Sequence, residues 1–223
     1  MMNKLNLKLM GAIAASALLL APIANAQLIV QISETADFSS NVEAIDTDGD
    51  GYVNLFSALG SWTLNSVSGL SNPFIGSDAY DELDLFSLNV SGGAGTLYIR
   101  LSNTGLTRTN DSFITSFGGT TNGSISFQSY IDSSNVHFGK ETLLSDSGIL
   151  STRAYSGIDS GVITNTTDAY SMSIYATITH RGEGQVSSFD YNIKVPEPSS
   201  LALLGIGLIA VGFASRRKRK QTA

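Results

Sequence analysis

The chain has 223 residues, a formal net charge of −6, a pI of about 4.8 and no cysteine. The absence of cysteine excludes disulfides and thiol chemistry, so the fold must depend on apolar burial and backbone pairing. The acidity is concentrated in residues 27–194, where six basic residues face 18 acidic ones. Such a charge balance disfavours nucleic acid and anionic lipid as partners.

The N-terminus has the three parts of a secretory signal peptide. Lys4 and Lys8 give a positive start, residues 9–20 are mainly apolar, and residues 24–26 form an A-x-A cleavage site. This order predicts a signal peptide over residues 1–26 and export of the chain that follows.

Residues 27–194 alternate between apolar and polar side chains with a period of two, and turn residues interrupt them. This pattern predicts an all-β fold, an antiparallel β-sandwich or jelly roll formed by one domain. Within residues 96–101, for example, apolar positions alternate with Tyr98 and Arg100. The expected strands cover 28–32, 52–56, 62–67, 85–90, 96–101, 124–131, 170–180 and 186–195. Because residues 181–185 form a short connection rich in Gly, the last two strands are predicted to form a hairpin.

One segment has the spacing of metal ligands. Positions 1, 3, 5 and 7 of an opening calcium loop correspond to Asp46, Asp48, Asp50 and Tyr52, the last through its backbone carbonyl. Gly51 supplies the turn, but position 12 is Ser57, where a carboxylate normally completes the coordination. The segment therefore predicts either a weak calcium site or an acidic Asp-Gly turn, and the two are compatible.

A second acidic cluster lacks ligand spacing, and we predict that it is a solvated loop. Its members are Asp78, Asp81, Glu82 and Asp84.

The C-terminus combines a short motif, an apolar stretch and a basic end. The motif consists of Val195, Pro196, Glu197 and Pro198. Residues 199–215, at about 1.5 Å per residue, form a predicted transmembrane helix of roughly 25 Å, somewhat short of a hydrocarbon core of about 30 Å. The basic end, which is predicted to stop transfer and stay on the cytoplasmic side, consists of Arg216, Arg217, Lys218, Arg219 and Lys220.

This tail resembles the PEP-CTERM sorting signal of Gram-negative bacteria, including glycines at positions 205, 207 and 212 within the apolar stretch. The resemblance covers residues 195–220. It implies a precursor held briefly in the inner membrane, cleavage near Pro196–Pro198 by the membrane peptidase exosortase, and release to the cell surface or extracellular matrix. Exosortase, the export machinery and the inner membrane are the implied partners. The same tail also carries the name of an ice-binding protein C-terminal domain, which follows the sorting tail and implies no ice binding.

Residues 60–90 resemble the N-terminal part of many uncharacterised exported PEP-CTERM proteins, a likeness that implies no activity.

Catalysis has little support in the sequence. His137 and His180 are the two histidines, and neither lies in a zinc-binding or nucleophile motif. We therefore expect no catalytic residues, and we expect that the chain is not an enzyme.

The sequence favours a structural or interaction protein of the cell envelope or of the exopolysaccharide matrix. The alternative is a calcium-dependent carbohydrate-binding module, with sugar platforms at Trp62, Tyr80, Tyr98 and Tyr130. A polysaccharide hydrolase is the third hypothesis. Calcium is the one cofactor that the sequence suggests, and exopolysaccharide is a further candidate partner.

Overall fold

The computed structural model describes residues 27–77, 80–107, 112–163 and 169–196. Within these residues the chain forms strands and loops without an α-helix, and therefore no helix that could cross a membrane. The strands are β1 (Leu28–Ser33), β2 (Val42–Ile45), β3 (Tyr52–Leu59), β4 (Trp62–Ser71), β5 (Tyr80–Gly92), β6 (Gly95–Leu106), β7 (Ser112–Thr121), β8 (Ser124–Asp132), β9 (Thr142–Asp146), β10 (Ala154–Val162), β11 (Tyr170–His180) and β12 (Gln185–Pro196).

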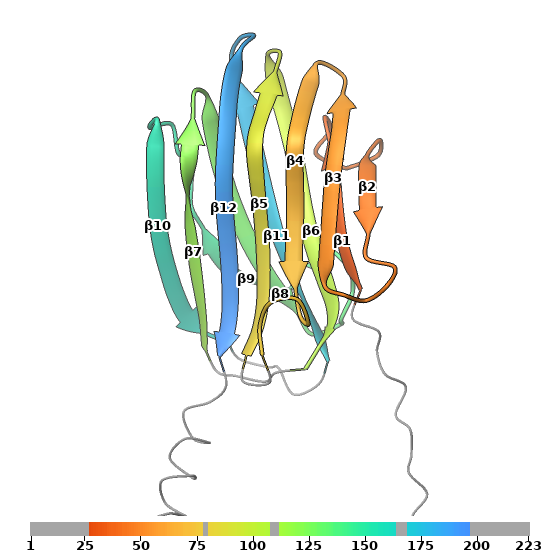
Figure 1. Ribbon diagram of the computed structural model, residues 1–223. Helices are drawn as coiled ribbons and strands as arrows, with labels where there is room; N and C mark the ends of the chain where they lie inside the picture. Colours follow the sequence, from red (N-terminus) through yellow and green to blue (C-terminus); the bar gives the residue numbers. More distant parts are fainter. Residues whose placement is uncertain (1–26, 78–79, 108–111, 164–168, 197–223) are drawn as a thin grey trace, which may run out of the picture.

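The strands form two antiparallel sheets of six strands that pack face to face (Figure 1). Sheet A has the order β2-β1-β6-β11-β8-β9, and sheet B has the order β10-β7-β12-β5-β4-β3. The predicted all-β antiparallel sandwich is confirmed. The predicted signal peptide and transmembrane helix lie outside the described residues.

Most connections cross from one sheet to the other. Hairpins within a sheet join β1 to β2, β3 to β4, β4 to β5 and β8 to β9, whereas the other consecutive strands lie in different sheets. The predicted hairpin of the last two strands is wrong, because β11 pairs with β6 and β8 while β12 pairs with β5 and β7. A short glycine-containing connection can turn within a sheet or pass over to the facing sheet, and local sequence does not distinguish the two.

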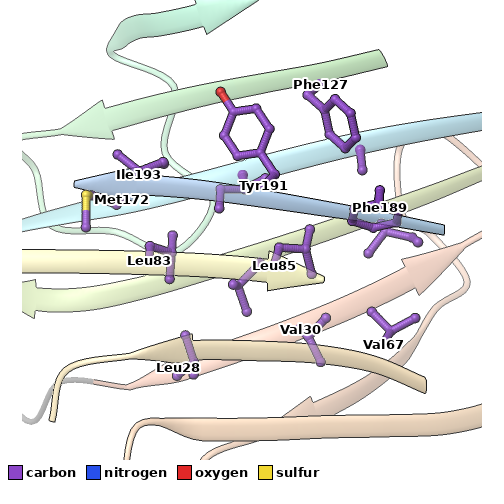
Figure 2. Close-up of a cluster of buried hydrophobic side chains, with 14 of the residues drawn as sticks. Leu28, Val30, Val67, Leu83, Leu85, Phe127, Met172, Phe189, Tyr191 and Ile193 are labelled. Carbon is purple, nitrogen blue, oxygen red and sulfur yellow. The ribbon is translucent and has the colours of Figure 1, made fainter. Parts of the chain in front are cut away.

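The core lies between the inward faces of the two sheets. Figure 2 shows Leu83 and Leu85 from β5, Tyr191 from β12 and Phe127 from β8 converging in this layer. All four side chains are fully buried, and burial of such a side chain contributes roughly 1.5–3 kcal/mol. The Tyr191 hydroxyl donates a hydrogen bond to Ser129 Oγ at 2.9 Å, which links the two sheets inside the core.

The predicted alternation within residues 96–101 is confirmed. Leu97, Ile99 and Leu101 are fully buried, while Tyr98 and Arg100 lie on the outer face of sheet A. Successive side chains along each strand point to opposite faces of the sheet. Each sheet therefore has an outward face of polar and aromatic side chains in addition to its inward core face.

The start of β1 and the end of β12 lie at the same end of the sandwich (Figure 1). The loop between β2 and β3 lies at this end too. The predicted sorting tail follows β12 in the chain, so it begins at this end of the domain.

Candidate functional site

The loop between β2 and β3 brings the three predicted carboxylate ligands together. One oxygen from each of Asp46, Asp48 and Asp50 lies within 4.8 Å of the others. Asp46 is buried, whereas Asp48 and Asp50 are exposed. Three anionic oxygens around one point are a donor set that suits a hard divalent cation such as calcium.

Backbone hydrogen bonds give this loop its shape. The Gly49 N–H donates to Asp46 Oδ1 at 2.7 Å, and the Gly51 N–H donates to Asp46 Oδ2 at 2.9 Å. Burial raises the pKa of Asp46, but the hydrogen bonds from Gly51 and Gly49 outweigh it, so the pKa lies below its usual value. Tyr52 contacts the cluster through its N–H, which donates to Asp50 Oδ1 at 2.8 Å. The geometry therefore combines a closed Asp-Gly turn with a convergent carboxylate group.

Position 12 of the loop, where a carboxylate would complete calcium coordination, falls at Ser57 in β3. Ser57 pairs with Leu64 inside this strand. At about 3.3 Å per residue, the extended chain carries Ser57 roughly 16 Å beyond Tyr52. The loop can therefore offer a cation three carboxylates and no closing carboxylate.

A polar row crosses the outer face of sheet A. The strand register aligns Gln31, Arg100, Tyr175 and Gln128 on β1, β6, β11 and β8. Arg100 donates from Nε and Nη2 to Gln31 Oε1 at 2.8 and 2.6 Å. At the other end of the row, Gln128 Nε2 donates to Asp146 Oδ2 at 2.9 Å. The row fixes the orientation of side chains that would otherwise be free on a sheet surface.

Two loops fold over this face and meet at Arg100. Its guanidinium carbon lies 3.9 Å from the ring centre of Phe38, from the β1–β2 loop, and 4.0 Å from that of Phe138, from the β8–β9 loop. Phe38 and Phe138 both have a left-handed backbone, with φ of 55° and 59°. This conformation is unfavourable for a bulky residue and persists only where surrounding contacts maintain it. The cation between the two rings is such a contact.

A small pocket lies beside this clamp, and we call it the cationic pocket. It has a volume of about 170 Å³. The side chains that define it are Phe38, Tyr98, Gln128, Lys140, Tyr175 and Thr177. Lys140 Nζ lies 3.8 Å from the ring centre of Tyr175 and 5.2 Å from that of Tyr130. Burial and the nearby charge of Arg100 lower the pKa of Lys140.

Two of the four predicted sugar platforms lie on this face, and one is excluded. Tyr98 and Tyr130 are both half-buried on the outer face of sheet A. Trp62 is 1% exposed and packs on His180 at a ring-centre distance of 4.8 Å, so its prediction as a sugar platform is wrong. Tyr80 belongs to sheet B, where Lys194 lies over its ring at 5.5 Å.

Sequence reasoning missed Phe38, Lys140 and Tyr175. The alternation of β11 contained the signal for Tyr175, because its neighbours Ile174 and Ala176 are both core residues. The other two residues come from loops, and no local pattern shows which strand face a loop will cover.

The predicted solvated acidic loop is wrong for the described members. Asp81, Glu82 and Asp84 lie in β5, and the first two are 4% and 7% exposed. The Tyr170 hydroxyl donates to Asp81 Oδ2 at 2.9 Å. The reason for the difference is that hydrogen bonds from other strands compensate the burial of these carboxylates. Asp78 lies outside the described residues.

On the outer face of sheet B, the pKa of the Asp84 carboxyl group is strongly shifted. Burial, followed by the charge of Asp190, raises the pKa of Asp84 to about 7. Asn192 Nδ2 donates to Asp84 Oδ2 at 3.2 Å and to Glu82 Oε1 at 2.7 Å, and Lys194 Nζ lies 3.1 Å from the same Glu82 oxygen. Asp84 Oδ1 is buried without a hydrogen-bond partner among the described residues. This face therefore holds a carboxyl group whose pKa is raised towards neutral pH.

A second hollow, of about 650 Å³, lies over β7, β10 and β12. Ser116, Ser156, Ile158 and Asp190 contribute to its lining, which contains no basic residue. It is wider than the cationic pocket and has fewer aromatic walls.

The two histidines differ in exposure, since His180 is buried and His137 is half-buried. His180 is 1% exposed, and its Nε2 lies 3.0 Å from Oγ of the fully buried Ser187. His137 Nε2 lies 3.3 Å from Gln27 Oε1. Burial lowers the pKa of both histidines.

The sorting motif begins inside the sandwich. Val195 is fully buried and pairs with Asp81, and Pro196 pairs with Tyr80 as the last residue of β12. Glu197, Pro198 and the basic residues 216–220 lie outside the described residues.

Residues 194–219 match the model of the PEP-CTERM protein-sorting motif. The tail is therefore recognised as a PEP-CTERM sorting motif, which implies export, a membrane-anchored precursor and exosortase-dependent sorting. No curated protein matches the sequence.

The solved structures that are similar to the chain include three with low TM-scores. The CBM36-1 domain of a multidomain xylanase from the hindgut metagenome of Trinervitermes trinervoides has 9% identity and a TM-score of 0.29, over 76% of this chain and 96% of that domain. Isomalto-dextranase of Arthrobacter globiformis T6, complexed with panose, has 13% identity and a TM-score of 0.29, over 70% and 27% of the chains. The enzymatically active domain of bacteriophage CBA120 tailspike protein 4 has 12% identity and a TM-score of 0.28, over 63% and 19%. Similarity at this level does not indicate a function for this chain.

Proposed function

We propose that this chain is a non-catalytic structural or interaction component of the cell envelope or exopolysaccharide matrix, delivered there after exosortase cleaves its tail. The match of residues 194–219 to the PEP-CTERM sorting motif is the observation that carries the proposal. The β-sandwich is the exported part, and the basic end of the tail keeps the precursor in the inner membrane until cleavage.

The position of the motif relative to β12 supports cleavage without damage to the domain. Val195 contributes a fully buried side chain to the core. A cut before Val195 would remove this side chain, whereas a cut after Pro196 leaves every residue of β12 in place. We therefore expect the mature C-terminus at Pro196 or a few residues beyond it.

The test is the intact mass of the protein recovered from its native envelope and culture medium. A product that begins at Gln27 and ends near Pro196–Pro198 supports the proposal. A product that still contains residues 216–220 contradicts it and identifies a permanent single-pass anchor. Glu197→Ala is expected to leave the tail attached, while Glu183→Ala, a matched exposed acid in the β11–β12 connection, is processed normally.

A calcium-dependent carbohydrate-binding module is the second candidate. The convergence of Asp46, Asp48 and Asp50 within 4.8 Å favours it, together with Tyr98 and Tyr130 on one sheet face. An incomplete extracellular calcium site has a dissociation constant on the order of 10⁻⁴–10⁻³ M. At about 10 mM calcium, such a site stabilises the fold by roughly 1.4–2.7 kcal/mol.

Thermal unfolding with calcium and with magnesium at equal concentration tests this candidate. A rise in Tm with calcium that Asp48→Asn abolishes and Asp37→Asn preserves supports calcium binding. An unchanged Tm at millimolar calcium rejects it and leaves the loop as an acidic turn.

A further inference from the structure

We propose that the cationic pocket on sheet A binds one carboxylated sugar residue of an anionic polysaccharide, with the sugar carboxylate at the Lys140 ammonium group. The inference deepens the proposed matrix function, because it names the class of polymer that the exported domain contacts.

The walls of the pocket suit a sugar ring. Phe38 and Tyr98 meet edge to face at a ring-centre distance of 6.4 Å and an angle of 65°, and Tyr175 forms part of the lining. Ligand pockets combine such apolar and aromatic walls with a few placed polar groups. The hydroxyls of Tyr98 and Thr177 supply polar groups for ring hydroxyls, whereas Gln128 is already bonded to Asp146 and Tyr130.

The size of the pocket limits what it accepts. Pockets for drug-sized ligands have volumes of roughly 300–1,000 Å³. The cationic pocket, at about 170 Å³, is smaller and holds one ring-sized unit of a longer ligand. A polymer can occupy it with a single residue while its neighbouring residues continue along the sheet surface.

The charge of the pocket selects an anion. Among the described residues, neither Lys140 nor Arg100 has a carboxylate oxygen within 4.0 Å, whereas Lys194 on the opposite face is paired with Glu82. Lys140 is exposed, and an ammonium group has three donors to offer. Acids outnumber bases by 18 to six in residues 27–194, yet the lining of this pocket contains the basic Lys140 and no acidic residue, and Arg100 lies beside it.

The pocket is held in shape before a ligand arrives. Hydrogen bonds to Gln31 hold the Arg100 guanidinium in place, and its carbon lies 3.9 Å from the ring centre of Phe38, which positions this ring. The Tyr175 hydroxyl donates to the Phe138 carbonyl oxygen at 2.7 Å, which fixes the loop that carries Lys140. Such preorganisation reduces the entropic cost of ordering side chains on binding. Arg100 and Tyr175 thus position the walls, and Lys140 contacts the carboxylate.

Calorimetric titration of the protein as purified from its native envelope tests the proposal. The probes are an oligogalacturonate, the same oligomer with its carboxyl groups reduced to alcohols, and poly-glutamate of similar charge. All titrations contain EDTA, so that calcium bound at the Asp46–Asp50 loop cannot bridge the anion. We expect binding of the oligogalacturonate, affinity weaker on the order of tenfold for the reduced oligomer, and no comparable binding of poly-glutamate.

Two lysine variants separate the role of the pocket from general electrostatics. Lys140→Met keeps the stem against Tyr175 and removes the charge, so the preference for the acidic over the reduced oligomer is expected to disappear. Lys194→Met removes a lysine that also lies over a tyrosine ring, on the opposite face, and is expected to bind like the wild type. Residual equal binding of both oligomers by Lys140→Met, with an unchanged Tm, identifies the ammonium group as the carboxylate contact.

The remaining outcomes overturn the proposal. Equal affinity of the wild type for acidic and reduced oligomers, equal binding of poly-glutamate, or retention of the acid preference in Lys140→Met would each do so. A lowered Tm in Lys140→Met does not change this reading, because the ratio of the two affinities is compared within one variant. The intact mass of the same preparation reports tail processing separately, so absent binding with a processed tail contradicts this inference alone.

Discussion

The two outer faces of the sandwich have the same strand geometry and opposite chemistry. On sheet A, two loops fold over the strands and place aromatic rings around Arg100 and Lys140. On sheet B, Asp190 acts electrostatically on Asp84 and lines a hollow together with Ile158, a strongly exposed apolar residue. Sheet A thus has Arg100 and Lys140 in contact with aromatic rings, whereas sheet B has partly buried carboxyl groups with Lys194 beside them.

The difference shows what a sandwich leaves open to variation. The inward positions of both sheets are restricted to apolar side chains by the core. The outward positions and the loops have no such restriction, so they determine charge and shape. The outer face of sheet A contains the cationic pocket, whereas that of sheet B contains Asp84, whose pKa is raised to about 7.

The largest expected effect concerns Asp84 on sheet B. Its pKa of about 7, compared with an ordinary value of 3.8, means that the unfolded chain loses the proton at lower pH than the folded protein. The stability linked to this group is therefore full below about pH 4, falls as pH rises towards 7 and stays reduced above 7. Asp84→Asn removes the charged form, and at about 1.4 kcal/mol per unit of pKa shift it should stabilise the protein at pH 8 by on the order of 4 kcal/mol.

Urea unfolding of Asp84→Asn and wild type between pH 4 and pH 8 measures this effect. The advantage of the variant should be near zero at pH 4 and greatest above pH 7. Asp159→Asn, at an exposed acid of the same sheet, is the matched control. An advantage that does not vary with pH contradicts the assignment.

Arg100→Met on sheet A should have the opposite sign. The substitution removes the cation between Phe38 and Phe138, and contacts of this kind contribute about 2 kcal/mol when they are shielded from water. We expect a lower urea midpoint and faster hydrogen exchange in the β1–β2 and β8–β9 loops. Arg153→Met, at an exposed arginine before β10, serves as the control. Unchanged exchange in both loops would show that Arg100 does not fasten them.

Lys194→Met should have the smallest effect on stability. The Lys194 side chain, which pairs with Glu82, is 47% exposed, and exposed ion pairs contribute only about 0–1 kcal/mol to the free energy of unfolding. The positive charge of Lys194 lowers the pKa of Asp84, so its removal should raise that pKa further. An NMR titration of the Asp84 carboxyl measures the shift, and a decrease would contradict the electrostatic account of sheet B.

The sequence predicted much of the fold because strands have a local signature. Each strand expected from the alternation coincides with an observed strand, as for β6 and β8. The sequence missed β2 and β9, which are short, and also β7 and β10. In β7, the glycines at 118 and 119 obscure the alternation. Packing requires glycine at position 119, because a Cβ there would clash with the Ser188 carbonyl oxygen.

The candidate sites were predictable to different extents. The carboxylates of residues 46–50 come together because they are close in sequence and share one turn. The cationic pocket combines Phe38, Tyr98, Lys140 and Tyr175, which are distant in sequence, so strand pairing and the folding of two loops over sheet A bring them together. The burial of Trp62 likewise depends on the facing sheet, where His180 contacts it, and that of Glu82 on its neighbours Asn192 and Lys194 in the adjacent strand.

The sequence by itself determined the period-two strands, the acidic loop and the sorting tail, since each is encoded within a short continuous segment. The tertiary structure alone decided that β11 and β12 belong to different sheets, that the pKa of Asp84 is raised and that Lys140 lies beside aromatic rings. The physical reason is the range of the interactions. Alternation and turn preferences act between neighbouring residues, whereas burial, pairing partners and local charge depend on segments that meet only after folding.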